Sequence, residues 1–267
     1  MRRRPDLMAE PRSIPPPIRN LTLRDRLCEL LGEALRHRAR AAPLYVLLAF
    51  GRVAGGGDGR EGVSRGALIE AAERLFQEFG LGVSAAAALD ELVSDGLLYQ
   101  DLAGGRDLRI TPGIDLASEF RAASLRFGAY RRALDALYRR ATRSSGEVEQ
   151  ALEEAACLFN EGLFFEVHEV LEAVWLKQDG QARRLLQGLI QIAVGFHHLE
   201  NKNLNGALNL LLEGWGKARE YGPDRFGVRL DRFLEEADAC RRSIESLGTE
   251  AFDRFDRRMI PRLELLG

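Results

Sequence analysis

The sequence predicts a mainly α-helical protein in two parts: helices with one β-hairpin, followed by an all-α bundle of about five helices. Apolar residues recur at the three- and four-residue spacing of amphipathic helices along most of the chain. A single pair of strand-like runs, near residue 100, flanks a glycine-containing turn. At 267 residues, the chain is long enough for two domains, each with a core of its own.

The composition is that of a globular protein and does not identify a partner. Hydrophobic residues make up 46% and charged residues 29% of the chain, which excludes a disordered protein. The formal net charge of −2 provides no general attraction to nucleic acid or to an anionic membrane. The sequence indicates no signal peptide, no membrane span and no nucleotide cofactor. Cys28, Cys157 and Cys240 lack disulfide or zinc spacing, so we expect a reducing, cytoplasmic setting.

The first elements follow from a proline run and from leucine spacing. Residues 1–20 contain three successive prolines and are predicted to form a mobile tail. Apolar residues at helical spacing then predict one helix from Leu21 and a second, short helix over 43–53.

Turn residues delimit the next elements. Ser64 and Ser84 are predicted N-caps of two further helices, which end near Gly80 and Gly96. A β-hairpin follows, in which residues 103–106 connect two strand-like runs.

Helix, helix, short turn, helix and hairpin in this order resemble a winged-helix domain, covering residues 21–114. DNA-binding members of this class place their last helix in the major groove, where basic or amide side chains contact the bases. In this chain the corresponding helix carries Asp90, Glu91 and Asp95 and no basic residue. A protein partner is therefore favoured over DNA, while arginines in the hairpin leave DNA binding open as the alternative.

Residues 115–146 predict a basic amphipathic connector helix followed by a linker. Aromatic residues and leucines occur at helical spacing among seven arginines, and the run Ser144, Ser145 and Gly146 breaks the helix. We expect this helix to pack against the domains with its arginines in solvent. Binding of an acidic partner is the alternative.

Residues 147–267 predict an all-helical domain without strand-like runs. The expected helices cover 147–161, 163–177, 181–202, 204–221 and 225–247, with a last helix from 249. A weak repeat places Asn160 and Gly162 in the same spacing as Asn201 and Asn203. Gly162 and Asn203 both suit a left-handed position at a helix end, which predicts two similar helical hairpins.

Two of these helices carry an unusual density of polar side chains. The first has Glu166, His168, Glu169 and Glu172, and the second has Arg184, Gln187, Gln191, His197 and His198. Such groups in apolar helices are costly unless each has a partner. His168 and Glu172 are neighbours one turn apart, beside Glu169 and away from the apolar face. In an antiparallel pair of helices, the polar stripe of the second helix can face these carboxylates.

Imidazole nitrogen and carboxylate oxygen are the ligands that zinc, manganese and iron accept, so the cluster predicts one divalent metal ion. In this hypothesis Glu166, His168 and Glu172 hold the ion, with help from His197 or His198. Glu169 is then the general base of a hydrolysis reaction.

Two alternatives remain open for the same residues. The helix has only one histidine in a His-Glu-x-x-Glu run, so it cannot build the two-histidine zinc site of His-Glu-x-x-His alone. A structural network is the first alternative, in which the carboxylates accept hydrogen bonds from Arg183, Arg184, His168 and the glutamines. A ligand pocket without metal is the second.

The residues carry a long motif. It reads Phe159-Asn160-x-Gly162-x-Phe164-Phe165-Glu166-x-His168-Glu169-x-Leu171-Glu172-x-x-Trp175, then Gln187-Gly188-Leu189-Ile190-Gln191-x-Ala193, then Asn203-x-x-Gly206-Ala207. This motif resembles the bacterial and archaeal domain of unknown function number 309. The resemblance implies a helical bundle and a metal-dependent hydrolase, with Glu166, His168, Glu169, Gln187 and Gln191 as site positions. The winged-helix-like half lies outside this resemblance.

Overall fold

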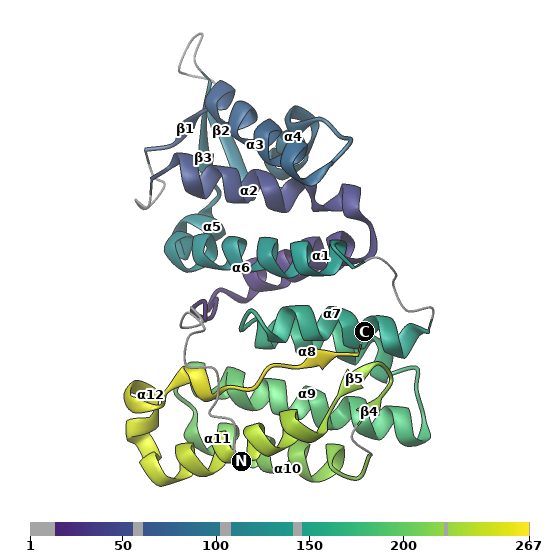
Figure 1. The fold of residues 1–267 in the computed structure, drawn as a ribbon. Helices are drawn as coiled ribbons and strands as arrows, with labels where there is room; N and C mark the ends of the chain where they lie inside the picture. The colour runs from purple at the N-terminus through teal and green to yellow at the C-terminus, as the bar shows by residue number, and fades with distance from the viewer. Residues whose placement is uncertain (1–13, 56–60, 102–107, 141–145, 222–223, 267) are drawn as a thin grey trace. The chain divides into compact units, whose positions relative to one another are not determined.

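The computed structural model describes residues 14–55, 61–101, 108–140, 146–221 and 224–266 (Figure 1). The chain forms two compact units, Pro15–Leu158 and Phe159–Gly267, and Ile14 belongs with the second. We call them the N-terminal unit and the helical unit. Helices dominate the described residues, so the predicted mainly-α fold with a C-terminal helical bundle is confirmed.

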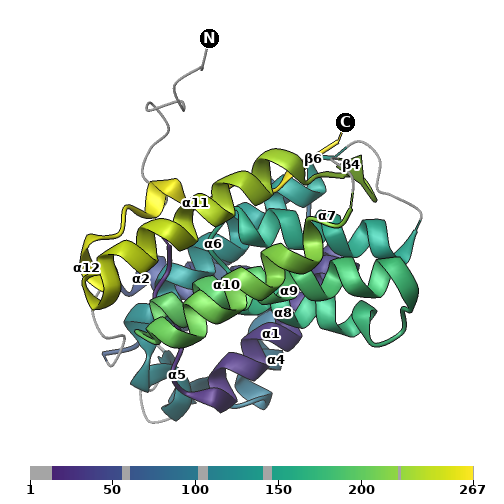
Figure 2. The same ribbon diagram turned by 90° about the horizontal axis from the view of Figure 1, so that it is seen from below.

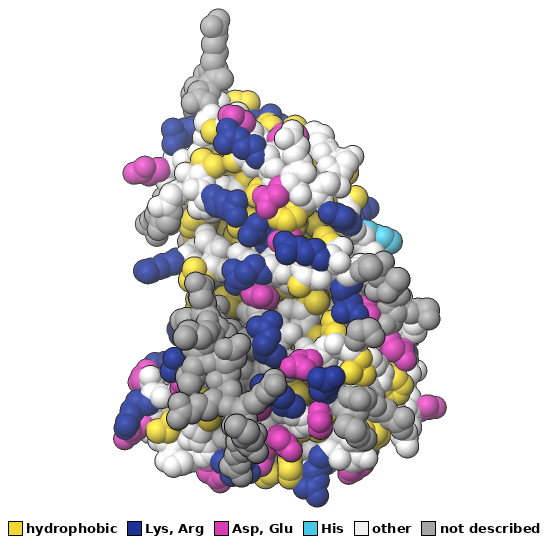
Figure 3. All heavy atoms as spheres, in the orientation of Figure 1, with side chains coloured by type: hydrophobic (Ala, Val, Ile, Leu, Met, Phe, Trp, Pro, Cys, Tyr) yellow, Lys and Arg dark blue, Asp and Glu magenta, His cyan; other side chains and the backbone are white. Residues whose placement is uncertain are grey.

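The surface charge and the lengths of the helices show how the chain meets its surroundings. On the helical unit, positive and negative side chains are interspersed over the face seen in Figure 3. Among the helices in the described part of the chain, none combines the length and the apolar character that crossing a membrane requires.

The N-terminal unit is built around α2, whose residues 42–50 are all buried. This helix packs against α3, α4 and α6, which explains its almost continuous apolar sequence. The helices of this unit are α1 (Leu21–Arg36), α2 (Ala42–Val53), α3 (Arg65–Phe79), α4 (Ala85–Ser94), α5 (Ile114–Ser118) and α6 (Phe120–Tyr138), with a short 3-10 helix η1 (Arg38–Ala41). Helix α7 (Glu147–Phe159) leads from this unit to the helical unit.

Three short strands form an antiparallel sheet in the N-terminal unit. The strands β1 (Val63–Ser64), β2 (Leu98–Asp101) and β3 (Arg109–Pro112) have the order β1-β3-β2. Two antiparallel pairings set their register, Val63 with Ile110 and Leu98 with Pro112. The predicted hairpin is therefore present, although residues 102–107 of its turn lie outside the described residues.

The predicted helix ends of this unit are largely confirmed. Ser84 caps α4 by accepting a hydrogen bond of 3.4 Å from the Ala87 amide, whereas Ser64 precedes α3 without a side-chain cap bond. Gly80 and Gly96 follow α3 and α4 with φ values of 61° and 71°, the left-handed conformation that glycine adopts without strain.

Part of the expected mobile tail is docked. Residues 1–13 lie outside the described residues, but Ile18 is buried and the Arg126 guanidinium donates a 2.9 Å hydrogen bond to the Pro16 carbonyl. The backbone amides of Arg19 and Asn20 both donate to one carboxylate oxygen of Glu119, at 2.7 Å each. Residues about a hundred positions away in the sequence make these contacts. Local sequence patterns therefore could not predict that this segment is docked.

The expected connector helix differs in two respects. It is split at Glu119 into α5 and α6, and α6 packs against α1 and α2 within the N-terminal unit. Arg126 was expected in solvent but is only 4% exposed. Residues 141–145, which contain most of the predicted linker, lie outside the described residues.

The helical unit has α9 at its centre. The long helix α9 (Gly180–Glu200) packs closely against α8 (Phe164–Trp175) on one side and α10 (Leu204–Ala218) on the other. Helix α11 (Asp231–Leu247) packs against α10 and lies beside it in Figure 2, and the short α12 (Ala251–Arg254) follows it. In the core, the ring of Phe159 forms edge-to-face contacts with those of Phe164, Phe196 and Phe233.

A small sheet in the helical unit was not expected. The strands β4 (Asp224–Arg225), β5 (Val228–Arg229) and β6 (Glu264–Leu265) pair in that order. The prediction of a helix from residue 225 was therefore wrong, because Phe226 and Gly227 form a tight turn with φ values of 47° and 80°. The expected last helix is replaced by two 3-10 turns, η2 (Gly248–Glu250) and η3 (Arg257–Met259), around α12.

The two expected helical hairpins place their left-handed residue at different positions. Gly162 has φ of 73°, as predicted, but the left-handed residue of the second hairpin is Lys202, at 59°, and not Asn203. Asn203 instead caps α10, because its side-chain oxygen accepts a 3.0 Å hydrogen bond from the Gly206 amide.

Candidate functional site

The polar residues of helix α8 differ in their burial. Phe164, Val167, Leu171 and Val174 face the core of the helical unit. Glu166 is also buried and only 1% exposed. His168, Glu169 and Glu172 lie on the accessible side, because they are displaced around the helix from the apolar stripe. Burial therefore distinguishes Glu166 from the other three predicted residues.

The side chains of His168, Glu169 and Glu172 come together on α8, and we call them the α8 triad. The Nδ1 atom of His168 lies 2.9 Å from Oε1 of Glu169, and its Nε2 atom lies 3.5 Å from Oε2 of Glu172. One ligand atom from each residue can be chosen so that all three lie within 4.8 Å of one another. The three side chains are 25%, 43% and 44% exposed, so solvent and solutes can reach them.

The donor set of the α8 triad fits a divalent ion. A carboxylate only accepts hydrogen bonds at neutral pH, so the 2.9 Å contact places the imidazole proton on Nδ1 and leaves the lone pair on Nε2. Two ligand atoms bound to one tetrahedral zinc ion are about 3.4 Å apart. The Nε2 atom of His168 and Oε2 of Glu172 meet this spacing at 3.5 Å. Glu169 holds the imidazole in the manner of an outer carboxylate in metal sites.

His197 presents its lone pair to a neighbouring amide. The Asn201 Nδ2 group donates to the His197 carbonyl at 3.0 Å and approaches His197 Nε2 at the same distance. Because a carbonyl only accepts, the Asn201 atom is the amide nitrogen, and Nε2 must accept. The imidazole proton is then on Nδ1, and the lone pair is already in use.

His198 has an equivalent restraint. The Asn203 side-chain oxygen accepts from the Gly206 amide, so its nitrogen is the group that faces His198 Nδ1, at 3.1 Å. In this arrangement neither His197 nor His198 offers a free lone pair to an ion. Both were predicted as helpers in metal binding, and their asparagine partners were not foreseen.

One aromatic ring separates the α8 triad from His197. The Phe165 ring centroid lies 5.9 Å from that of His168 and 5.4 Å from that of His197. His197 in turn lies 6.5 Å from His198. The histidines of α9 therefore reach the same side of the unit as the triad, with the Phe165 ring between His168 and His197.

In the polar stripe of α9, Gln191 forms its hydrogen bonds with α10, and Arg184 forms its bond with a residue just after α10. Arg184 pairs with Glu220 at 2.6 Å, and the Gln191 amide nitrogen donates to Glu213 at 2.7 Å. Lys217 donates to the Gln191 oxygen at 2.7 Å. Gln187 is half-buried on the same helix. Arg184 and Gln191 thus act in fixing the α9–α10 pair, and Glu213, Lys217 and Glu220 are partners that the sequence did not identify.

Arg183 also differs from the expected network. Its NH1 group donates to the carbonyls of Trp175 and Gln178, at 3.1 Å each, and its guanidinium stacks 4.0 Å from the centre of the Trp175 ring. A cation at this position satisfies the free carbonyls at the C-terminal end of α8. Arg183 therefore closes α8 and does not bind its carboxylates.

A comparison with protein families agrees with the motif. Residues 152–210 match the family model described as Domain of unknown function (DUF309). The matched stretch of DUF309 begins within α7 and ends within α10, so it contains the whole α8 triad and both α9 histidines. It does not reach α1–α6. The family description names no activity. No curated protein and no solved structure matches the chain.

Proposed function

We propose that the α8 triad binds one divalent ion, zinc, manganese or iron, and that the chain is a metal-dependent hydrolase. One observation carries this proposal: His168 Nε2 and Glu172 Oε2 are 3.5 Å apart while Glu169 holds the opposite imidazole nitrogen at 2.9 Å. The geometry of the triad supports the metal-binding part, and the hydrolase part rests on the chemistry that an accessible divalent ion would supply.

The residues of the triad have distinct roles in this proposal. His168 and Glu172 bind the ion, and Glu169 fixes the ring orientation and the tautomer of His168. Two protein ligands leave open positions, which the exposure of the triad makes accessible to water and substrate. A divalent ion there supplies Lewis acidity and activates water for hydrolysis. We assign Glu169 this orienting role in place of the predicted role of general base, because its oxygen is already engaged by His168.

Metal binding is tested with the full chain purified without chelator or nickel column. Metal analysis and calorimetric titration with zinc, manganese and iron(II) should give one ion per chain. His168→Ala should abolish binding. Two histidine controls should leave it unchanged: His37→Ala, an exposed residue of the N-terminal unit, and His198→Ala, whose lone pair faces Asn203.

The alternative is a structural network without metal. His168 and Glu172 then form a side-chain pair between successive turns of α8, and His168→Ala lowers the melting temperature without changing any bound ion. Absence of stoichiometric metal from the unaltered chain, even after titration, would favour this alternative and a non-catalytic adaptor role.

We further propose that residues 21–114 form a winged-helix domain that binds a protein partner. The strand order β1-β3-β2 around α3 and α4 supports the winged-helix assignment. On α4, Asp90 pairs with Arg65 at 2.9 Å and Asp95 pairs with Arg26 at 3.5 Å. The carboxylates repel phosphate groups, and Arg109 of the hairpin already donates to the carbonyls of Glu61 and Gly62.

DNA binding is the alternative for this domain and is simple to test. We expect no mobility shift of mixed-sequence duplex DNA at low salt. A shift that weakens steeply as salt increases would instead identify a DNA-binding regulator.

A further inference from the structure

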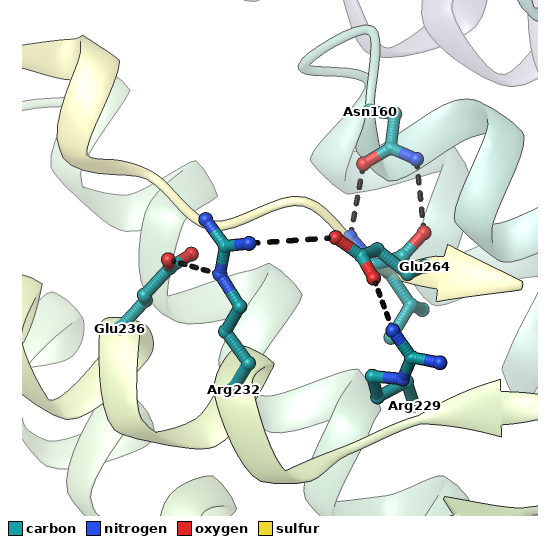
Figure 4. Close-up of polar contacts among 6 residues, drawn as sticks. Asn160, Arg229, Arg232, Glu236 and Glu264 are labelled. Atoms are coloured by element: carbon teal, nitrogen blue, oxygen red, sulfur yellow. Dashed lines mark hydrogen bonds and ion pairs between the residues drawn. The ribbon is translucent and has the colours of Figure 1, made fainter. Parts of the chain in front are cut away.

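Residues 260–266 form an extended segment that is bonded along both edges of its backbone, and we call it the docked segment (Figure 4). On one edge, β6 pairs with β5, with Glu264 opposite Arg229. The Leu266 amide continues this edge by donating a 2.8 Å hydrogen bond to the Gly227 carbonyl. Successive residues of a strand direct their backbone groups to opposite edges, so those of Leu263 point away from β5.

Asn160 occupies that opposite edge. Its amide nitrogen donates to the Leu263 carbonyl and its amide oxygen accepts from the Leu263 nitrogen, at 3.0 Å each. The side-chain amide of Asn160 therefore replaces one residue of a neighbouring strand, as Figure 4 shows. It does so from the turn between α7 and α8, within the motif.

The side chains of the docked segment follow a simple pattern. Ile260 and Leu263 are each 3% exposed and anchor the segment in the unit. Glu264 next to them pairs with Arg229 at 3.1 Å and lies 3.8 Å from Arg232 (Figure 4). The groove thus accepts an apolar residue, a second apolar residue three positions later, and an acidic residue directly after it.

We propose that the groove between Asn160 and β5 is a strand-addition site for an extended peptide of a partner protein with this apolar–x–x–apolar–acidic pattern. The docked segment is its intramolecular occupant. Main-chain hydrogen bonds and alternating side-chain pockets are the recognition mode of proteins that bind peptides by adding a strand. Two arginines complement the charge of the acidic position.

The proposal requires that the docked segment leaves its groove while the rest of the unit stays folded. Its ladder with β5 is short, and its ion pairs are solvent-exposed, so they contribute little to stability. The chain before it is held separately: Arg257 pairs with Glu200 at 3.1 Å, and the Cys240 thiol donates to the Met259 carbonyl at 3.0 Å. These contacts hold the chain immediately before the docked segment.

The test places the peptide and the groove in separate molecules while keeping the full chain. Leu263→Asp puts an unpaired carboxylate at a buried position and releases the docked segment from its own groove. A fluorescent peptide with the sequence of residues 260–266 should then bind the variant saturably, measured by anisotropy. Binding to the unaltered chain should be at least about tenfold weaker, because the intramolecular segment competes at a high effective concentration.

Three controls identify the groove. Adding Asn160→Ala to the Leu263→Asp chain should weaken peptide binding about tenfold, since two hydrogen bonds are lost. A peptide with Glu264→Lys should bind more weakly. Leu212→Asp, at a position 50% exposed on α10, should behave like the unaltered chain.

A folded Leu263→Asp chain that binds no peptide, or binds it regardless of Asn160→Ala, overturns the proposal. If Leu263→Asp does not fold, hydrogen exchange of the unaltered chain decides. The amides of Leu263 and Leu266 should exchange through local opening while α9 stays protected. Exchange of these two amides only through global unfolding also overturns the proposal.

Discussion

The hydroxyl group of Tyr45 on α2 donates a hydrogen bond of 3.2 Å to a carboxylate oxygen of Asp135 on α6, inside the N-terminal unit. Burial raises the pKa of both groups; the charge of Asp135 raises the pKa of Tyr45 further, whereas the hydrogen bond from Tyr45 opposes the rise in the pKa of Asp135. Arg131 and Arg139 oppose the shift of Asp135 by favouring its charged form, and Glu78 adds to it. The Asp135 carboxylate thus joins α2 and α6, although its burial disfavours its charged form.

The raised pKa of Asp135 predicts a pH dependence of stability. The folded state holds the Asp135 proton more tightly than the unfolded state, so this contribution is complete below the ordinary aspartate pKa and is lost as pH rises through the raised value. Asp135→Asn keeps an acceptor for Tyr45 and removes the titration. The unfolding free energy of the variant relative to the unaltered chain should therefore increase with pH across this window, as measured by urea unfolding at several pH values.

The controls for this prediction use the other partner. Tyr45→Phe removes the donor and should cost about 1–3 kcal/mol at neutral pH, because the buried carboxylate loses a hydrogen bond. A constant difference between Asp135→Asn and the unaltered chain at all pH values would contradict the assignment.

Glu169 should affect metal affinity without being a ligand. Glu169→Gln changes the group that holds His168 Nδ1 and leaves Nε2 and Glu172 in place, so we expect affinity to fall roughly 10–100-fold while the stoichiometry is unchanged. Competition against a chelating dye measures this change. Glu235→Gln on α11, also at an exposed position, is the matched control and should have no effect. Complete loss of binding in Glu169→Gln would make Glu169 a ligand.

Local patterns predicted the helices well, because an amphipathic helix and its caps depend on residues close in sequence. Gly80, Gly96 and Ser84 lie at the expected helix ends, and most helix bounds differ by only a few residues. The small sheet escaped prediction because two-residue strands have almost no periodicity. Its pairing of Val228 with Leu265 also joins distant parts of the chain.

The candidate site was predicted only in part, because sequence spacing indicates neighbours within one helix and not partners on another. Spacing along one helix predicted that His168 and Glu172 are neighbours, since residues four positions apart lie on the same face, and the structure brings Glu169 close to them. Spacing could not reveal that Asn201 and Asn203 engage the α9 histidines. Hydrogen bonds to main-chain atoms, such as those of Arg183 and Asn160, leave no signal in side-chain patterns.

A methyl group at Gly214 should disturb the close contact between α9 and α10. A Cβ atom there would lie 2.6 Å from the Gly188 carbonyl oxygen and 2.8 Å from the Ile192 nitrogen, both backbone atoms that cannot move independently. Gly214→Ala should therefore lower the unfolding free energy by about 1–3 kcal/mol. Gly216→Ala on the same helix meets no atom within 4 Å and should stabilise by roughly 0.5–1 kcal/mol. Equal effects of the two substitutions in thermal unfolding would refute the contact.

Cys240 should be unreactive in the folded protein. Burial raises the pKa of its thiol to about 12, and the thiol donates to the Met259 carbonyl at 3.0 Å. Only the thiolate attacks alkylating and disulfide reagents, so at pH 8 Cys240 should react no faster than the protein opens. Cys157 is buried as well, whereas Cys28 is partly accessible. Iodoacetamide labelling followed by mass spectrometry should find Cys28 modified first, and Cys28→Ser should leave a nearly unreactive native protein that labels fully in denaturant. Rapid labelling of Cys240 in the native state would mean that the chain around Met259, from which the docked segment extends, is not held as the structure describes.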